Sequence, residues 1–122
     1  KVIKEIDAGP IYSKKDLDLS GNAQEIYERA SKVCEKIIIE MTTKTLEPIP
    51  QSGDPTYFER RRPSQSNLKG ASNLDEIYNM IRMLDADGYP KAFLELKDFK
   101  VEFSNCELKD GIIKTRATFK KI

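Results

Sequence analysis

The 122-residue chain contains no histidine and no tryptophan, and only two cysteines, Cys34 and Cys106. The lack of histidine excludes a Ser-His or Cys-His nucleophile, and any histidine-bearing metal site, within these residues. Two isolated cysteines do not make a zinc site, so no metal is expected. Cys34 lies on the apolar side of a helical pattern, which indicates a reduced, structural thiol and a cytoplasmic protein.

The chain also lacks a charge excess and a long apolar run. Its 21 basic residues nearly balance 20 acidic ones, so no overall attraction to nucleic acid or an anionic membrane is expected. No run approaches the ~20 apolar residues of a membrane span, and no signal peptide opens the chain. The length allows one domain, or one domain with part of another. The first residue is Lys1 rather than Met, which indicates a truncated or processed start.

The most informative stretch is residues 3–11. Apolar residues predict a short strand over 1–6, and Asp7 follows it at the start of an Ala-Gly-Pro turn. Gly9 accepts backbone angles closed to other residues, and Pro10 fixes its own. An acid that ends a strand in an α/β protein lies at a sheet edge where ligands often bind. On the residues alone, Asp7 either faces a ligand or hydrogen-bonds its own turn.

Residues 12–41 predict an extended segment followed by a long helix. Leucines alternate with acids over 12–19, and Ser-Gly-Asn at 20–22 offers N-cap oxygens. Apolar residues then recur at three-four spacing from Ala23 to about Met41, so a buried helical stripe is expected. Such a stripe needs a large partner surface. The partner is either the C-terminal part of this chain or, as we favour, a sheet upstream of Lys1 in a longer protein.

Residues 46–55 predict a linker, because three prolines and a glycine forbid the interior of a helix or strand. Residues 63–70 are polar and are also expected to be irregular. Between them, Tyr57 and Phe58 precede Arg60, Arg61 and Arg62. The aromatics either dock on the domain while the arginines face solvent, or the group contacts the bases or phosphates of an acceptor.

The last third predicts one helix and three strands. A stripe over 74–84 follows a capping pair at 72–76, and Gly88 and Pro90 end the helix. Arg82 in its last turn either complements the helix dipole or has a structural or acceptor-side role. Alternating residues over 91–97, 99–104 and 111–119, joined by turn signals, predict an antiparallel meander with one apolar face covered by this helix.

Several pieces resemble one family. Asp-Ala-Gly-Pro-Ile at 7–11 resembles the Asp-x-Gly-x-Ile segment of the formyltransferases that use 10-formyltetrahydrofolate, which include methionyl-tRNA and sugar-nucleotide N-formyltransferases. The other pieces follow in the family's order: Gln-Glu-Ile-Tyr at 24–27, Pro-Gln-Ser-Gly at 50–53, Tyr-Phe-Glu-Arg-Arg-Arg-Pro at 57–63, and Ile-Arg-Met-Leu-Asp at 81–85 with Pro-Lys-Ala-Phe at 90–93. No single piece is specific, but together they span most of the chain.

The resemblance implies an α/β fragment in three parts. Residues 1–45 would be the last strand-turn-helix of a Rossmann-like formyltransferase domain, 46–71 a proline-rich linker, and 72–122 a small helix plus three-stranded antiparallel β domain. Carried over by position, Asp7 would be catalytic, with Gly9 and Pro10 shaping its turn. The family's Asn-x-His pair and most folate-binding loops would lie upstream, so this chain alone is expected to be inactive.

The implied donor is 10-formyltetrahydrofolate, and the acceptor stays open. The short, charge-balanced C-terminal part resembles enzymes of small amino sugars slightly more than the methionyl-tRNA enzymes. Arg60, Arg61, Arg62 and Arg82 are the candidate acceptor-binding residues. Similar C-terminal β units pair between subunits in sugar enzymes, which implies a homodimer. The alternative is a free-standing, non-catalytic binding module that contacts nucleic acid or a protein partner.

Overall fold

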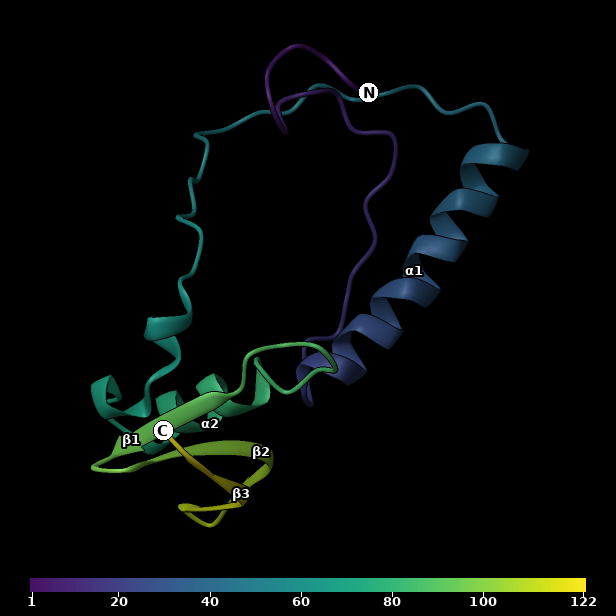
Figure 1. Cartoon of the computed structure of the whole chain (residues 1–122). Helices are drawn as coiled ribbons and strands as arrows, with labels where there is room; N and C mark the ends of the chain where they lie inside the picture. Colours follow the sequence, from purple (N-terminus) through teal and green to yellow (C-terminus); the bar gives the residue numbers. More distant parts are fainter. The chain divides into compact units, whose positions relative to one another are not determined.

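A computed structural model describes all residues, 1–122 (Figure 1). In chain order its elements are helix α1 (Ala23–Thr43), the short 3₁₀ helices η1 (Pro63–Ser66) and η2 (Leu68–Gly70), helix α2 (Leu74–Arg82), and strands β1 (Ala92–Leu96), β2 (Phe99–Lys109) and β3 (Ile112–Lys121). The chain divides into two units, Lys1–Leu19 with Tyr27–Glu59 and Ser20–Ile26 with Arg60–Ile122. Neither α1 nor α2 has the length and apolarity needed to cross a membrane.

Helix α1 begins with a capping box. The Asn22 side-chain oxygen accepts a hydrogen bond from the Glu25 N–H at 2.9 Å, and the Asn22 N–H donates to the Glu25 carboxylate at 2.8 Å. These bonds satisfy amide groups that a helix N-terminus leaves without intrahelical partners. The predicted start at residue 23 is confirmed, and the helix continues two residues beyond Met41.

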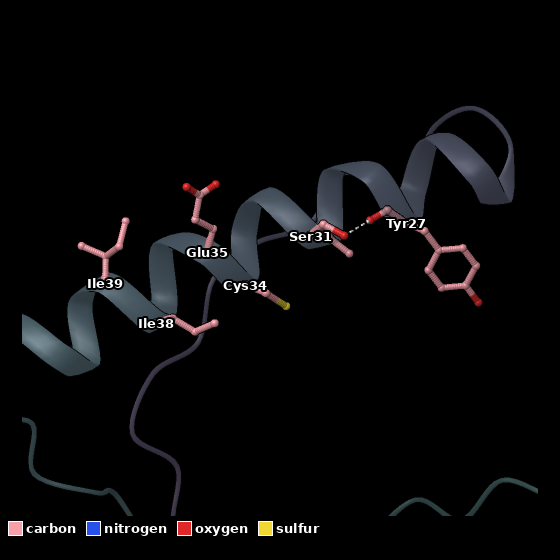
Figure 2. A pocket seen from close by; sticks show the side chains of 7 residues that line it. Tyr27, Ser31, Cys34, Glu35, Ile38 and Ile39 are labelled. Atoms are coloured by element: carbon pink, nitrogen blue, oxygen red, sulfur yellow. Dashed lines mark hydrogen bonds between the residues drawn. The ribbon is translucent and has the colours of Figure 1, made fainter.

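The apolar stripe of α1 is buried only in its first turn, at Ala23 and Ile26. Tyr27, Cys34 and Ile38 project together from one side of the helix, and the side chain of Ile38 is 61% exposed (Figure 2). Packing on the C-terminal part of the chain therefore accounts for the first turn alone. Cys34 is a free thiol as predicted, but it is exposed rather than buried.

The predicted strand over 1–6 is wrong, because these residues form bends and a turn. A strand needs a neighbour that takes its backbone hydrogen bonds, and this unit offers none to residues 1–6. Residues 12–19 are also without strand pairing, and they are tied to α1 by side chains. The Lys15 ammonium lies 2.7 Å from the Glu40 carboxylate, and Arg29 donates to the Asp18 carbonyl at 3.0 Å.

The second unit contains the predicted antiparallel meander in the order β1-β2-β3. Helix α2 covers it, as predicted, and the core holds Leu68, Ile81, Leu84 and Ala92. The apolar face is only partly covered: Val101 is buried, whereas its cross-strand partner Phe119 is 66% exposed. Strand β3 is thus a largely exposed strand at the edge of the sheet.

The segment 63–70 is more ordered than the sequence indicates. It forms η1 and η2, and it buries Ser66 and Leu68. Asn67 makes an isolated parallel bridge to Phe93, which partly covers the outer edge of β1. The expectation of an irregular segment is wrong here because 3₁₀ turns this short carry no apolar periodicity.

Strand β2 extends five residues beyond the predicted end at Ser104, through a bulge. Asn105 has φ of 52°, and the pairing register shifts between Ser104 and Glu107. Asp85 holds the bulge from the α2–β1 connection: one carboxylate oxygen accepts from the Asn105 N–H at 2.6 Å, and the other accepts from the Lys91 ammonium at 2.8 Å. The polar pair Ser104-Asn105 interrupts the alternation, which explains the early predicted end.

Two opposing effects act on the pKa of the Asp85 carboxyl. Burial raises it, but the hydrogen bonds from Lys91 and Asn105 together outweigh burial, so the pKa lies below its ordinary 3.8. Because the charged form is favoured in the folded protein, Asp85 contributes stability above about pH 3.8. That contribution is lost as the pH falls through the lowered folded pKa.

We therefore expect Asp85→Asn to lower the free energy of unfolding by about 1–3 kcal/mol at pH 7. The difference from wild type should shrink when unfolding by urea is measured at pH 3 and below. The neighbouring, exposed Asp87 is the matched control, because its carboxylate makes no such contacts, and Asp87→Asn should change little at either pH. If the free energy of unfolding of Asp85→Asn lies below that of wild type by the same amount at every pH, this assignment is contradicted.

Candidate functional site

The turn that carries Asp7 has a left-handed residue, but it is not the glycine. Asp7 has φ of 55°, a conformation uncommon outside glycine, whereas Gly9 is not in this region. Gly9 is required for space: a Cβ there would lie 1.8 Å from the Lys1 carbonyl oxygen. The expectation that Gly9 supplies the unusual backbone angles is therefore corrected to Asp7.

The turn is held by the linker, from more than forty residues away. The side-chain nitrogen of Gln51 donates to the carbonyl of Asp7 at 2.7 Å and to that of Gly9 at 2.9 Å. Next to it, Ile11 and Ile49 exchange two backbone hydrogen bonds, at 2.8 and 2.9 Å. These four bonds attach the proline-rich segment to the Asp7 turn.

A hollow lies where the turn and linker meet. Its lining consists of Ile6, Asp7, Ala8 and residues 51–58. Tyr57 and Phe58 are each 89% exposed, so the predicted docking of these aromatics on the domain is wrong for this chain. The Asp7 carboxylate is exposed and makes no hydrogen bond or ion pair with the rest of the chain. The hollow therefore combines an accessible carboxylate with accessible aromatic rings.

The three consecutive arginines belong to the second unit, and all are exposed. Arg61 donates to the Gln65 carbonyl at 3.0 Å, and the backbone N–H of Arg62 donates to the Gln65 side chain at 2.6 Å. The Gln65 contacts fix the chain at the start of η1. The guanidinium groups of Arg60 and Arg62 face solvent, where they are accessible to an anion.

Arg82 connects two segments of the second unit. Its guanidinium donates to the Asn79 side chain at 2.8 Å and to the Gly21 carbonyl at 2.9 Å, and it lies over the Tyr78 ring at 5.7 Å. These contacts tie the end of α2 to the residues before α1. Of the roles considered for Arg82, these contacts favour the structural one.

Cys106 does not have the character of a nucleophile. Burial raises the pKa of its thiol, and the nearby Asp85 carboxylate raises it further. Its sulfur lies 3.7 Å from the Tyr78 carbonyl, which accepts a weak hydrogen bond. A thiol held protonated at neutral pH is unreactive, so Cys106 is a packing residue beside the core.

The sequence predicts that Gln51 lies in the linker, but it does not predict a contact between Gln51 and the Asp7 turn. A glutamine amide in a proline-rich stretch is a weak signal, since it offers donors without indicating an acceptor. The contacts join residues 44 and 42 positions apart, and no periodicity connects them. Only the three-dimensional arrangement shows that the linker completes the Asp7 turn.

Residues 63–120 are similar to a known protein domain. The family model for the C-terminal domain of methionyl-tRNA formyltransferase matches residues 63–120. Over these residues the chain is similar to that domain. The matched residues contain helix α2 and the three-stranded antiparallel sheet, whereas the expected Rossmann-like part is not seen in this chain.

The similarity extends over nearly the whole chain. A solved methionyl-tRNA formyltransferase from Clostridium thermocellum is 42% identical and superimposes with a TM-score of 0.92 over 98% of this chain and 53% of its own. The methionyl-tRNA formyltransferases of Thermodesulfovibrio yellowstonii and a Sulfurihydrogenibium species are 28% and 22% identical, over 87% and 88% of this chain. This chain spans 36% of the length of each of these two relatives.

The names of these three relatives are relevant to the identity of the formyl acceptor. All three relatives are methionyl-tRNA formyltransferases, and none supports the preference for an amino-sugar acceptor or the free-standing binding module.

Proposed function

We propose that this chain is the C-terminal part of a methionyl-tRNA formyltransferase, which moves a formyl group from 10-formyltetrahydrofolate to the amino group of methionyl-tRNA in the cytoplasm. The observation that carries the proposal is the 42% identity, over 98% of the chain, to a solved enzyme of that name. The accessible Asp7 carboxylate beside a hollow is consistent with it.

In this proposal Asp7 acts on the proton of the acceptor's amino group. The acceptor nitrogen can attack the formyl carbon only after its ammonium proton has left, so a base must take that proton. A carboxylate beside the nitrogen can do so, or can stabilise another base in its charged form. The exposed, unpaired carboxylate of Asp7 can do either. Bound 10-formyltetrahydrofolate supplies the formyl group; apart from Asp7 at the reacting centre, we assign no residue of this chain to it.

The uncovered side of α1 supports a longer enzyme. Tyr27 and Ile38 are 48% and 61% exposed, and exposed apolar stripes of this kind mark interaction surfaces. The relatives are longer than this chain, so they contain additional segments that could cover such a stripe. We assign the cover to a sheet of the catalytic domain upstream of Lys1.

The three arginines are the proposed contacts to acceptor phosphates. Residues 72–122 hold as many acidic as basic groups, so this part provides no general attraction to RNA, and local cations must provide it. Replacing Arg60, Arg61 and Arg62 together by Gln should raise the KM for methionyl-tRNA about tenfold and leave kcat nearly unchanged. The dependence of KM on salt should weaken as well.

The matched control replaces three exposed lysines of the first unit, Lys14, Lys32 and Lys36, by Gln. It removes the same charge, so an equal rise in KM would show a general charge effect and contradict the assignment to the arginines. The measurement is the initial rate of formyl-methionyl-tRNA formation at several tRNA and salt concentrations.

The exposed edge strand β3 supports a homodimer. Its outer edge is unpaired in the sheet order, and Ile112 and Phe119 are 60% and 66% exposed. Unpaired edges readily add a further strand. The molecular mass of the full-length protein in solution tests this, and a monomer at micromolar concentration would reject it.

The identity of the acceptor is tested by supplying two candidate acceptors in separate reactions. Full-length protein is supplied with 10-formyltetrahydrofolate and either methionyl-tRNA or an amino-sugar nucleotide, and formylated product is measured. The proposal expects product from methionyl-tRNA. An amino sugar remains the second candidate because residues 72–122 are charge-balanced, and product from the sugar alone would favour it.

A further inference from the structure

We infer that Gln51, in the proline-rich linker, is a positioning residue for Asp7. The inference rests on the proposed catalytic role of Asp7. The linker would then hold part of the active site in place as well as connect two parts of the chain.

The first reason is the pairing of donors and acceptors. The Gln51 amide nitrogen carries two hydrogens, and it donates to two carbonyls, at 2.7 Å from Asp7 and 2.9 Å from Gly9. One side chain therefore fixes the separation of two carbonyls that flank Ala8. This bridge restricts the backbone angles of Ala8 and Gly9, and the bond to the Asp7 carbonyl fixes the peptide plane that follows the Asp7 Cα.

The second reason is the backbone conformation of Asp7. At φ of 55°, Asp7 is in the left-handed region, which is uncommon outside glycine although aspartate enters it more readily than most residues, so contacts that favour this conformation help to fix the turn. The Asp7 carboxylate makes no hydrogen bond or ion pair with the rest of the chain, so a constraint on Asp7 acts through its backbone. The Gln51 bonds to the carbonyls of Asp7 and Gly9 meet that requirement.

The third reason is that the linker is itself aligned. Ile49, two residues before Gln51, exchanges backbone hydrogen bonds with Ile11, two residues after Gly9. Pro48 and Pro50 flank Ile49 and restrict its freedom. Gln51 is thus presented to the turn by a short, stiff segment rather than by a free loop.

Only some side chains can substitute. Glutamate has the length but no hydrogen to donate, and it would place a negative charge against two carbonyl oxygens. Asparagine has the amide but is one methylene shorter, so it cannot reach both carbonyls from the same backbone. Gln51→Glu and Gln51→Asn should therefore both fail to replace glutamine, with Gln51→Asn retaining more function.

The kinetic test uses the full-length enzyme and methionyl-tRNA. Because small errors in the placement of a catalytic group are costly, Gln51→Ala should lower kcat about tenfold to thirtyfold, with KM changed less than about twofold. In the Asp7→Asn background the same change should cost less than about twofold, because Gln51 acts only through Asp7. Equal losses in both backgrounds would overturn the inference.

The matched control is Glu47→Ala, which truncates a long, exposed polar side chain of the same linker that makes no hydrogen bond. It should leave kcat within twofold of wild type. A loss equal to that of Gln51→Ala would mean that the linker is sensitive to any truncation, which would also overturn the assignment.

Hydrogen exchange separates this inference from the proposed function. The Ile11 amide donates to the Ile49 carbonyl at 2.8 Å, so it reports the linker–turn contact whatever reaction occurs. In Gln51→Ala it should exchange about tenfold faster than in wild type. Unchanged exchange would refute the role of Gln51 in holding the turn, whereas a wild-type enzyme without formyl transfer would refute the proposed function.

Discussion

Asp7→Asn is expected to lower kcat of the full-length enzyme about a thousandfold, within the range that a positioned acid or base contributes. Asparagine has nearly the same shape and tolerates the left-handed backbone that Asp7 adopts, so the turn should survive. It cannot take a proton or stabilise a positive charge. The loss should therefore fall on kcat, with little change in the KM for either substrate or in the Tm.

The control is Asp16→Asn, an exposed acid of the same unit that makes no hydrogen bond or ion pair. It removes the same charge and should leave kcat within about twofold of wild type. Initial rates with methionyl-tRNA and 10-formyltetrahydrofolate provide the measurement. Wild-type turnover in Asp7→Asn would remove Asp7 from the mechanism.

The second large effect is on stability. Ile81 is 1% exposed and packs in the core beneath the sheet with Leu84 and Ala92. Truncation to alanine removes buried apolar surface and leaves a cavity, so Ile81→Ala should cost about 3 kcal/mol. That corresponds to about a hundredfold in the folding equilibrium of the C-terminal unit.

Native-state hydrogen exchange of the strand β2 amides measures this effect for the C-terminal unit within the full-length protein. The control is Ile112→Ala, the same chemical change at a side chain that is 60% exposed, and it should cost less than about 0.5 kcal/mol. Similar values for the two variants would contradict the assignment of the core.

The elements with a strong repeating pattern could be predicted from the sequence. Helix α1 follows from apolar residues at three-four spacing after a capping residue, and the three strands follow from alternation between turn signals. These signals are local, because they reflect which side of one element is buried. The packing of α2 on the sheet follows from its own stripe.

The features that the sequence did not predict depend on distant residues. The bulge at Asn105 is held by Asp85, twenty residues away, and the Asp7 turn is held by Gln51, more than forty residues away. Neither contact produces a periodic pattern in the amino-acid sequence. The strand expected over 1–6 has sufficient apolar character but no neighbour, which shows that local propensity does not make a strand without a partner.

The sequence points to Asp7 by its place before a Gly-Pro turn and by family resemblance. In the structure Asp7 lines a hollow, and its catalytic role stays a prediction. The left-handed residue was assigned to Gly9, since glycine is the usual occupant, but Asp7 takes it. For Arg82, the bonds to Asn79 and Gly21 provide a structural explanation that the sequence alone left open.

The most direct test of the central claim is to read the gene in frame upstream of the codon for Lys1. The account predicts an Asn-x-His segment followed by Leu-Pro-x-x-Arg-Gly, the motifs that the formyltransferase resemblance places before Asp7. With them, Asp7 would complete a formyl-transfer site. A start codon immediately before Lys1 would contradict the account, because the chain would then lack the histidine that the proposed reaction needs.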